Sequence, residues 1–196
     1  MSPPKLAELL EKARACTVCA PHLPFPPKPV LRVSATAVLL IVGQAPGRRV
    51  HETGVPWNDP SGDRLRQWLQ MTREEFYDVR RIAIIPTGLC FPGTGKGGDL
   101  PPRPECALLW HPPLRAAMPR LRLTLLVGSY AQAYYLGDRR KETLAATVHA
   151  YQEYLPDYFP LPHPSPRNQR WFKQHPWLEQ EVIPALRVRV GELCDI

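Results

Sequence analysis

The sequence predicts an α/β protein, a three-layer α/β/α sandwich around a central, mainly parallel four-stranded sheet. Short, continuous apolar runs are typical of strands that are buried on both faces of a parallel sheet. Helix-like stretches separate these runs along the chain, as in parallel α/β folds. No internal repeat or low-complexity linker divides the 196 residues. We therefore expect a single domain over residues 1–196, long enough to bury a sizeable core.

Four short apolar runs are the expected strands. The first three are mostly aliphatic, and each is followed at once by Gly or Pro. In chain order the runs are Ala37–Val42, Ile82–Ile85, Leu123–Val127 and Tyr158–Leu161. Ligands of parallel sheets bind beyond the carboxyl ends of the strands. We therefore expect the functional residues in the loops after Val42, Ile85 and Leu161.

Helices are expected between and around these strands. An N-terminal helix is predicted over Lys5–Ala15, where Leu6, Leu9 and Leu10 recur at helical spacing. The other expected helices are Ser61–Gln70, Arg103–Met118, Ser129–Leu136, Leu144–Tyr151 and Pro176–Leu186. The chain also has 25 prolines. Because proline is excluded from most helix and inner-strand positions, long ordered loops have to surround the centre.

The charge balance favours a polyanionic partner. Lys and Arg number 25 against 18 Asp and Glu, which gives a net charge of +7. No run of about 18 apolar residues occurs, so a membrane span is excluded. Residues 1–12 lack the charged and apolar regions of a secretory signal. We therefore expect a cytoplasmic monomer without a membrane partner.

The loop after the first strand has two groups of residues that suit ligand binding. The sequence GQAPG at 43–47 lets the backbone turn sharply and approach a ligand, and it matches neither nucleotide-binding glycine fingerprint. Trp57, Asn58 and Asp59 follow, just before an expected helix. One interpretation makes Trp57 a core anchor and Asp59 or Ser61 the helix N-cap. The other makes Trp57 a stacking platform and Asp59 a base that orients water.

The loop after the fourth strand has the sequence HPSPRN at 163–168. Its two prolines alternate with polar residues, which fixes the backbone and projects His163, Ser165 and Arg167. A single histidine is structural in most proteins, but this one lies where the fold places ligands. The loop is therefore a second candidate for ligand binding.

Together, GQAPG at 43–47 and HPSPRN at 163–168 resemble the two motifs of the uracil-DNA glycosylase superfamily. The second motif, with the later Lys173, is most similar to the single-strand-selective monofunctional branch. The first motif, residues 54–57 and the cysteines are more similar to the iron–sulfur branch of thermophiles. The resemblance implies a monofunctional DNA glycosylase that flips out a deaminated base, uracil first. It would hydrolyse the N-glycosidic bond in base excision repair and leave an abasic site.

The same resemblance implies roles around the base. His163 would donate to the oxygen of the departing base, the largest electrostatic contribution. Gly43 and Gln44 would line the base pocket with main-chain donors, and Trp57 would stack on the base. No lysine lies in the motifs as an amine nucleophile, so we expect no lyase activity.

Two departures from the family pattern affect the chemistry. Ala45 stands where the best-known branch has an aspartate that activates water. Asp59 is the expected substitute, because its position resembles that of the catalytic aspartate in another branch, two residues before Ser-Gly. Ile85 and Pro86 stand where the iron–sulfur branch has an asparagine that contacts uracil. Asn58 is the candidate replacement, and the identity of the base stays open.

The resemblance also implies contacts between the second motif and the DNA around the flipped base. Ser165 would bind a phosphate next to the lesion, and Arg167 would fill the gap left in the duplex. Asn168 and Lys173 are further expected DNA contacts. The basic residues near these loops would neutralise phosphates, although a solvated basic face is the alternative. They are Arg48, Arg49, Lys96, Arg103, Arg167, Arg170 and Lys173.

Four of the five cysteines form a metal-ligand pattern. In a reducing compartment they are not expected as disulfides. Their spacing follows the iron–sulfur branch, which implies a structural [4Fe–4S] cluster with four cysteine ligands. Zinc and buried free thiols are the alternatives. The four residues are Cys16, Cys19, Cys90 and Cys106.

Two rival hypotheses remain. The missing aspartate at Ala45 also fits a non-catalytic or covalently trapping protein that binds DNA lesions. The second hypothesis is a metal-containing module that binds nucleic acid and has no base pocket. Turnover on DNA with a damaged base separates the enzyme from both.

Overall fold

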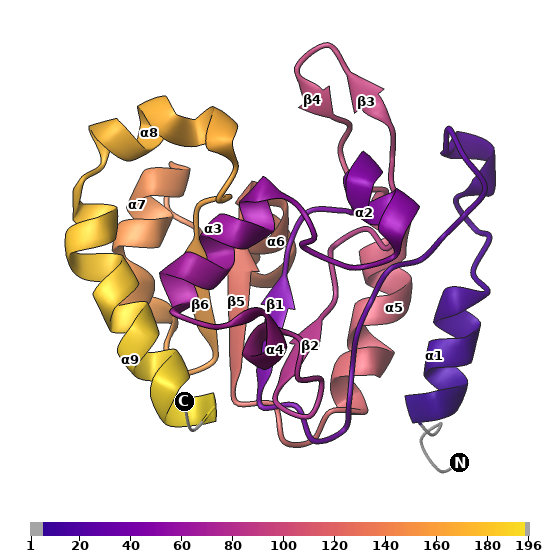
Figure 1. Cartoon of the computed structure of the whole chain (residues 1–196), viewed down its shortest axis with the longest axis horizontal. Coiled ribbons are helices and arrows are strands. Elements are labelled where there is room, and N and C mark those ends of the chain that lie inside the picture. Colours follow the sequence, from indigo (N-terminus) through magenta and orange to yellow (C-terminus); the bar gives the residue numbers. More distant parts are fainter. Residues whose placement is uncertain (1–5, 195–196) are drawn as a thin grey trace.

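A central four-stranded sheet organises residues 6–194, the part of the chain that the computed structural model describes (Figure 1). All strand pairs are parallel, in the order β2-β1-β5-β6. The strands are β1 (Leu39–Val42), β2 (Ile82–Ile84), β5 (Leu123–Val127) and β6 (Tyr158–Leu161). The expected mainly parallel sheet is therefore confirmed, with β1 and β2 slightly shorter than the apolar runs that predicted them.

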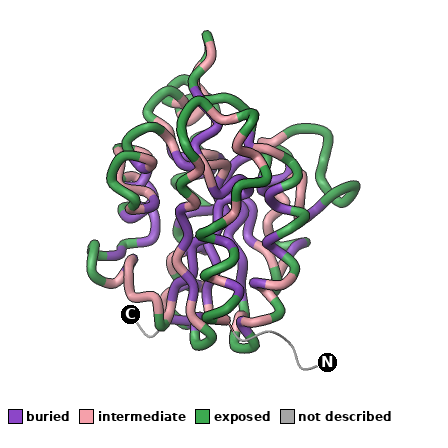
Figure 2. Tube along the Cα trace, turned by 90° about the vertical axis from the view of Figure 1, so that its right-hand side faces the viewer, coloured by how far each residue is buried: buried purple, intermediate pink, exposed green. Residues whose placement is uncertain are grey.

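The sheet buries a core on each face, because side chains alternate across a strand. Leu39, Ile41 and Leu125 belong to the core on one face. Leu40, Val42 and Leu126 belong to the core on the other face. All six side chains are fully buried. Figure 2 shows the buried strands as a purple centre enclosed by exposed loops and helix surfaces.

Helices form the two outer layers. Residues of α3, α4, α7 and α9 contribute to the first core, and residues of α1, α5 and α6 to the second. The first group comprises α3 (Pro60–Leu69), α4 (Arg73–Phe76), α7 (Leu144–His149) and α9 (Ile183–Cys194). The second comprises α1 (Leu6–Arg14), α5 (Pro104–Ala116) and α6 (Ser129–Leu136). This arrangement confirms the three-layer α/β/α class.

Several short elements in the connections were not predicted, because they are too short to show an apolar period. They are α2 (Arg48–Thr53), α4, α8 (Gln169–Gln174) and a hairpin of β3 (Thr94–Gly95) and β4 (Gly98–Asp99). Single 3₁₀ turns occupy Ala20–His22, Gly137–Arg139, Tyr151–Tyr154 and Pro166–Asn168. In Figure 1 the hairpin projects beyond the end of the sheet at which the strand arrows point.

Several predicted helices have different ends, α3 and α5 by one or two residues. The one expected to reach Tyr151 stops at His149. The last one starts with a π-helical turn at Leu178–Val182 and runs on to Cys194, beyond the expected Leu186. Lys5, the expected start of the first helix, lies outside the described residues. Within the described ranges, no helix combines the length and apolar character needed to cross a bilayer.

Candidate active site

The loops that follow β1, β2 and β6 enclose a cavity of about 420 Å³. It lies at the carboxyl ends of the strands, where ligands of parallel sheets bind. Both sequence motifs contribute to its wall. Lining residues include Gly43, Gln44, Ala45, Pro46, Gly47, Trp57, Asp59, Ser61, Ile84, Pro86, Asp99, His163, Ser165, Arg167 and Asn168.

The rings of Trp57 and His163 meet at this cavity. Their centroids are 5.7 Å apart and their planes are inclined by 33°. The indole comes from the loop after β1 and the imidazole from the loop after β6, so the fold unites two distant segments. An aromatic face and a polar ring at one cavity suit a planar, hydrogen-bonding ligand.

Two glycines let Trp57 occupy its position. A side chain at Gly62 would place its Cβ 1.8 Å from the Trp57 carbonyl oxygen, and one at Gly43 would reach 2.8 Å from the indole Cζ2. Trp57 itself has φ of 57°, a conformation that is uncommon outside glycine. Arg66 Nη1 donates to the Trp57 carbonyl at 3.1 Å. The backbone around the indole is therefore held by close packing and a charged donor.

Asp59 has both features that the sequence suggested. It is the N-cap of α3, and its Oδ1 accepts from the Gly62 amide at 2.8 Å. Its side chain also lines the cavity. A capping bond fixes the orientation of a carboxylate, because the acceptor has to point at the first turn of the helix. Structural and chemical interpretations of Asp59 are thus compatible.

Burial favours the neutral form of the His163 imidazole. Burial lowers its pKa below the usual value, and the nearby carboxylates of Asp59 and Asp99 only partly oppose this shift. Asn168 Nδ2 donates to the His163 carbonyl at 2.9 Å. Gly128, at φ of 90°, packs against the imidazole side chain, since a Cβ at Gly128 would be 3.5 Å from the His163 Cβ. A neutral imidazole has one N–H donor and one acceptor.

A family model for the uracil DNA glycosylase superfamily matches residues 32–187. The chain belongs to the uracil-DNA glycosylase superfamily. The match includes both loops that carry the cavity motifs, together with Cys90 and Cys106, and it begins after Cys16 and Cys19. Membership supports a DNA glycosylase-type hydrolase of DNA repair, acting on DNA with damaged bases.

Residues of the second motif of this glycosylase family line the cavity. Ser165 and Arg167 both line it. Ser165 Oγ accepts from the Arg167 amide at 3.2 Å, and Arg64 Nη1 donates to the Ser165 carbonyl at 3.4 Å. The Arg167 guanidinium lies over Gly98, where a Cβ would approach its Nη1 to 2.5 Å. The motif is thus packed against the β3–β4 hairpin.

Two predicted site residues do not line the cavity. Asn58, expected to contact the base, instead accepts from Arg73 Nη2 at 2.9 Å through Oδ1 and donates to Thr53 Oγ1 at 3.5 Å. The chain turns at Trp57, whose φ is 57°, so adjacency in sequence does not bring the Asn58 side chain to the cavity. Lys173 lies on α8, exposed and away from the lining residues.

Asp99 is a cavity residue that the sequence did not identify. It lies at the end of the β3–β4 hairpin, directly after the glycine-rich residues 93–98. No local pattern marks it, since its place at the cavity depends on how the hairpin folds back over the first motif. Gln44 Nε2 donates to the Leu100 carbonyl at 3.2 Å and ties that motif to the hairpin.

The four pattern cysteines line a second, small cavity together with apolar side chains such as Leu89 and Trp110. Burial raises the pKa of Cys90 to about 11 and that of Cys106 to about 12. The Leu89 amide donates to Cys106 Sγ at 3.2 Å. Among residues 6–194, no three His, Cys, Asp or Glu side chains are close enough to form a ready metal site. The thiols are gathered, but they do not form a closed ligand set.

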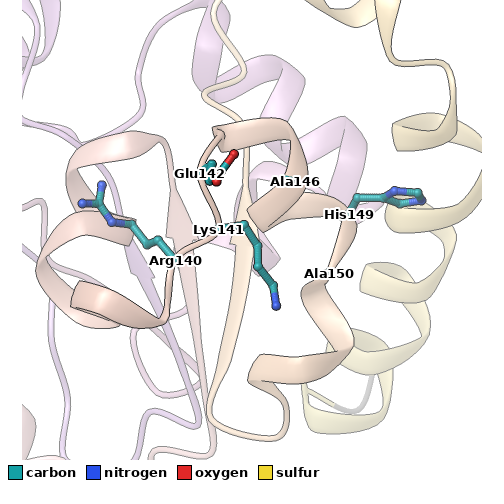
Figure 3. Close-up of a pocket in the computed structure, with 6 residues that line it drawn as sticks. All are labelled: Arg140, Lys141, Glu142, Ala146, His149 and Ala150. Carbon is teal, nitrogen blue, oxygen red and sulfur yellow. The ribbon is translucent and has the colours of Figure 1, made fainter.

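A third hollow, of about 590 Å³, lies beside α7 (Figure 3). In Figure 3 its charged side chains Arg140, Lys141 and Glu142 point in different directions and do not converge. Lys141 is paired with Glu153. The His149 ring stacks on another aromatic side chain, at 4.5 Å between centroids. This hollow has no superfamily motif residue, so the cavity at the strand ends is the candidate active site.

Proposed function

We propose that the protein is a monofunctional DNA glycosylase that excises a deaminated base, uracil first, and leaves an abasic site. The observation that carries this proposal is the meeting of the Trp57 and His163 rings at one cavity. A volume of about 420 Å³ accommodates either a pyrimidine or a purine. A base inside a duplex is out of reach of such a cavity, so the target nucleotide has to be flipped out.

Binding of the flipped base rests on stacking and on fixed backbone groups. Trp57 would stack on the base, a contact that is worth about 1–3 kcal/mol for a nucleobase on an aromatic side chain. Gly43 and Gln44 would supply main-chain contacts. Thr87 donates to the Gly43 carbonyl through its amide at 2.9 Å and its hydroxyl at 2.7 Å. The first motif is therefore rigid before the base arrives.

The chemical step needs charge stabilisation at two places. As the glycosidic bond breaks, the base leaves as an anion and the sugar becomes cationic. The N–H of neutral His163 would donate to the oxygen of the leaving base. The oriented carboxylate of Asp59 would stabilise the sugar cation and hold the attacking water. No lysine is found among the described residues that line the cavity, which supports base release without a lyase step.

Phosphate contacts would hold the DNA over the cavity. Ser165 and Asn168 line the cavity and would contact a phosphate next to the flipped nucleotide. Arg167 would leave its place over Gly98 and enter the gap in the duplex. Lys173, exposed on α8, would contact a more distant phosphate.

The test is base release from oligonucleotides that contain uracil, hypoxanthine or xanthine. Wild-type protein should give free base and alkali-labile abasic sites with turnover. His163→Ala should lower the single-turnover rate by about 100-fold or more, with DNA binding retained. His149→Ala, a histidine outside the cavity, is the matched control. A tight or irreversible complex without product would instead support a lesion-binding protein.

We also propose that Cys16, Cys19, Cys90 and Cys106 hold a [4Fe–4S] cluster with a structural role. Two observations support this fit. Four thiols line one cavity that has no His, Asp or Glu among its lining residues, and the Leu89 amide already donates to Cys106 Sγ. Such a centre would supply cross-links between the proline-rich loops and no chemistry for base release.

Metal analysis of protein purified without oxygen tests this assignment. Iron and acid-labile sulfide in equal amounts, with a broad visible absorption band, are expected. Zinc without sulfide would indicate a tetrahedral thiolate site instead. Cys106→Ser should abolish the band, whereas Cys194→Ser, which changes the cysteine outside the pattern, should retain it.

A further inference from the structure

A second carboxylate reaches the cavity from outside both motifs. Asp99, the last residue of β4, lines the cavity together with His163 and Asp59. Its negative charge acts on the His163 ring in the same direction as that of Asp59. Two carboxylates from different elements therefore line the cavity that His163 also lines.

Asp99 lies against the first motif. A Cβ at Gly47 would be 3.2 Å from the Asp99 Oδ2 atom. Two residues earlier in the same loop stands Ala45, whose side chain has no group that could bind water. The hairpin therefore brings a carboxylate oxygen to a loop whose own sequence has none at that position. Glycine at 47 leaves the space that this oxygen occupies.

The carboxylate of Asp99 is available for chemistry. Its Oδ1 accepts from Thr94 Oγ1 at 3.3 Å within the hairpin, and Oδ2 faces the Gly47 side. In the part of the chain that the structure describes, Asp99 forms no ion pair. The residue is exposed, so water reaches it. Asp59, by contrast, has one oxygen committed to the helix cap.

We propose that Asp99 is a second catalytic carboxylate, which accepts the proton of the attacking water at the first-motif side of the cavity. The inference rests on the proposed glycosylase function. The bond between C1′ of the sugar and the base nitrogen breaks, and its electron pair leaves with the base. The water oxygen then bonds to C1′, and one water proton passes to the Asp99 carboxylate. The base anion takes up a proton from solvent.

Asp99→Asn tests this role with little change in shape. We expect the single-turnover rate of base release to fall by at least tenfold. Binding to the same DNA should stay equal or become tighter, because a negative charge near the phosphates is removed. Asp99→Glu should recover part of the rate. Asp138→Asn, an exposed aspartate on a distant 3₁₀ turn, is the matched control and should behave as wild type.

The pH profile adds a readout that a purely structural role would not change. In wild type the rate should fall on the acidic side, and the acidic limb of Asp99→Asn should differ from it in shape. A variant with a rate within twofold of wild type would overturn the inference. Parallel loss of rate and affinity without rescue by Asp99→Glu would also overturn it. Wild-type protein that releases no base at all would instead contradict the proposed function itself.

Discussion

At the scale of single residues, the position of the indole depends on two places where a side chain is absent. Gly62 permits α3 to approach the Trp57 backbone, and Gly43 permits the indole to lie on the first motif. These contacts differ in kind. The first involves a carbonyl that cannot move without shifting the helix, whereas the second involves the edge of a side chain.

Gly43→Ala should therefore affect activity more than stability. The new methyl group would push the indole by several tenths of an ångström toward the cavity, since its Cβ would be 2.8 Å from Cζ2. We expect base release to fall at least tenfold, with only a small change in the thermal midpoint. Gly97→Ala is the control, because a Cβ there would have nothing within 4 Å. Full activity of Gly43→Ala would contradict the stacking role of Trp57.

His111 links the second core to the loop after β2. Its Nδ1 lies 2.6 Å from the Tyr135 hydroxyl and its Nε2 lies 3.0 Å from the carbonyl oxygen of Pro86, a cavity residue. Burial lowers the pKa of His111 to about 4. The folded state therefore resists its protonation, while the unfolded chain takes up a proton at the ordinary pKa.

The stability of the protein should fall as the pH drops from the ordinary histidine pKa toward 4. Both states are neutral at His111 above that range, and only the unfolded state is protonated within it. Between pH 7.5 and 5 this linkage costs about 2 kcal/mol of unfolding free energy. Urea titrations at both pH values measure it. His111→Asn should be less stable at pH 7.5 but should lose less on acidification; an equal loss in both proteins would contradict the assignment.

At the scale of elements, Asp59 shows how one residue fixes both a helix and a site. As the N-cap of α3 it satisfies the amide of Gly62, the glycine that contacts the Trp57 backbone. Substitutions that keep the helix cap but remove the charge can therefore separate the contribution of Asp59 to stability from its contribution to catalysis.

Asp59→Ala should lower the unfolding free energy by about 1 kcal/mol through loss of the cap. Asp59→Asn should stay close to wild-type stability, because asparagine is also a good N-cap. Both variants should lose base-release activity, since both remove the charge. Denaturant titration and single-turnover kinetics on the same preparations provide the measurement. Equal stability of all three proteins would contradict the capping role.

The strands and the long helices were predictable because their burial leaves a pattern in the sequence. Leu123–Val127 and Ser129–Leu136 match the structure at both ends. The β3–β4 hairpin left no such pattern, because glycine-rich turns also occur in flexible loops. Its position over the first motif follows from tertiary contacts, such as the bond from Gln44 to the Leu100 carbonyl.

The candidate site was predictable in part for the same reason. His163 and Trp57 stand in loops that follow strand ends. In a parallel sheet these loops lie at the same edge, so the fold brings their side chains together. Asn58 was assigned by adjacency, and its side chain is held by Arg73 instead. Asp99 was missed because no sequence pattern indicates that a hairpin residue will line a cavity formed by loops distant in the sequence.

At the scale of the whole molecule, the net charge of +7 predicts binding to DNA that depends strongly on salt. The logarithm of affinity should fall linearly with the logarithm of salt, by about 0.9 per phosphate neutralised on duplex DNA. Lys173→Ala should lower the magnitude of this slope by about 0.9, the contribution of one phosphate. Lys12→Ala, on α1 in the opposite helix layer, should leave it unchanged. Equal slopes for Lys173→Ala and wild type would exclude Lys173 from the interface.

The central claim is that an extruded base occupies the cavity that Trp57 and His163 line. A crystal structure with DNA that contains 2′-fluoro-deoxyuridine tests it most directly, since the fluorine slows cleavage by disfavouring the sugar cation. We expect the uracil to lie against the indole, with one of its oxygens within about 3.2 Å of the His163 ring nitrogen. A uracil that stays stacked in the DNA, or that binds in the hollow beside α7, would contradict the account.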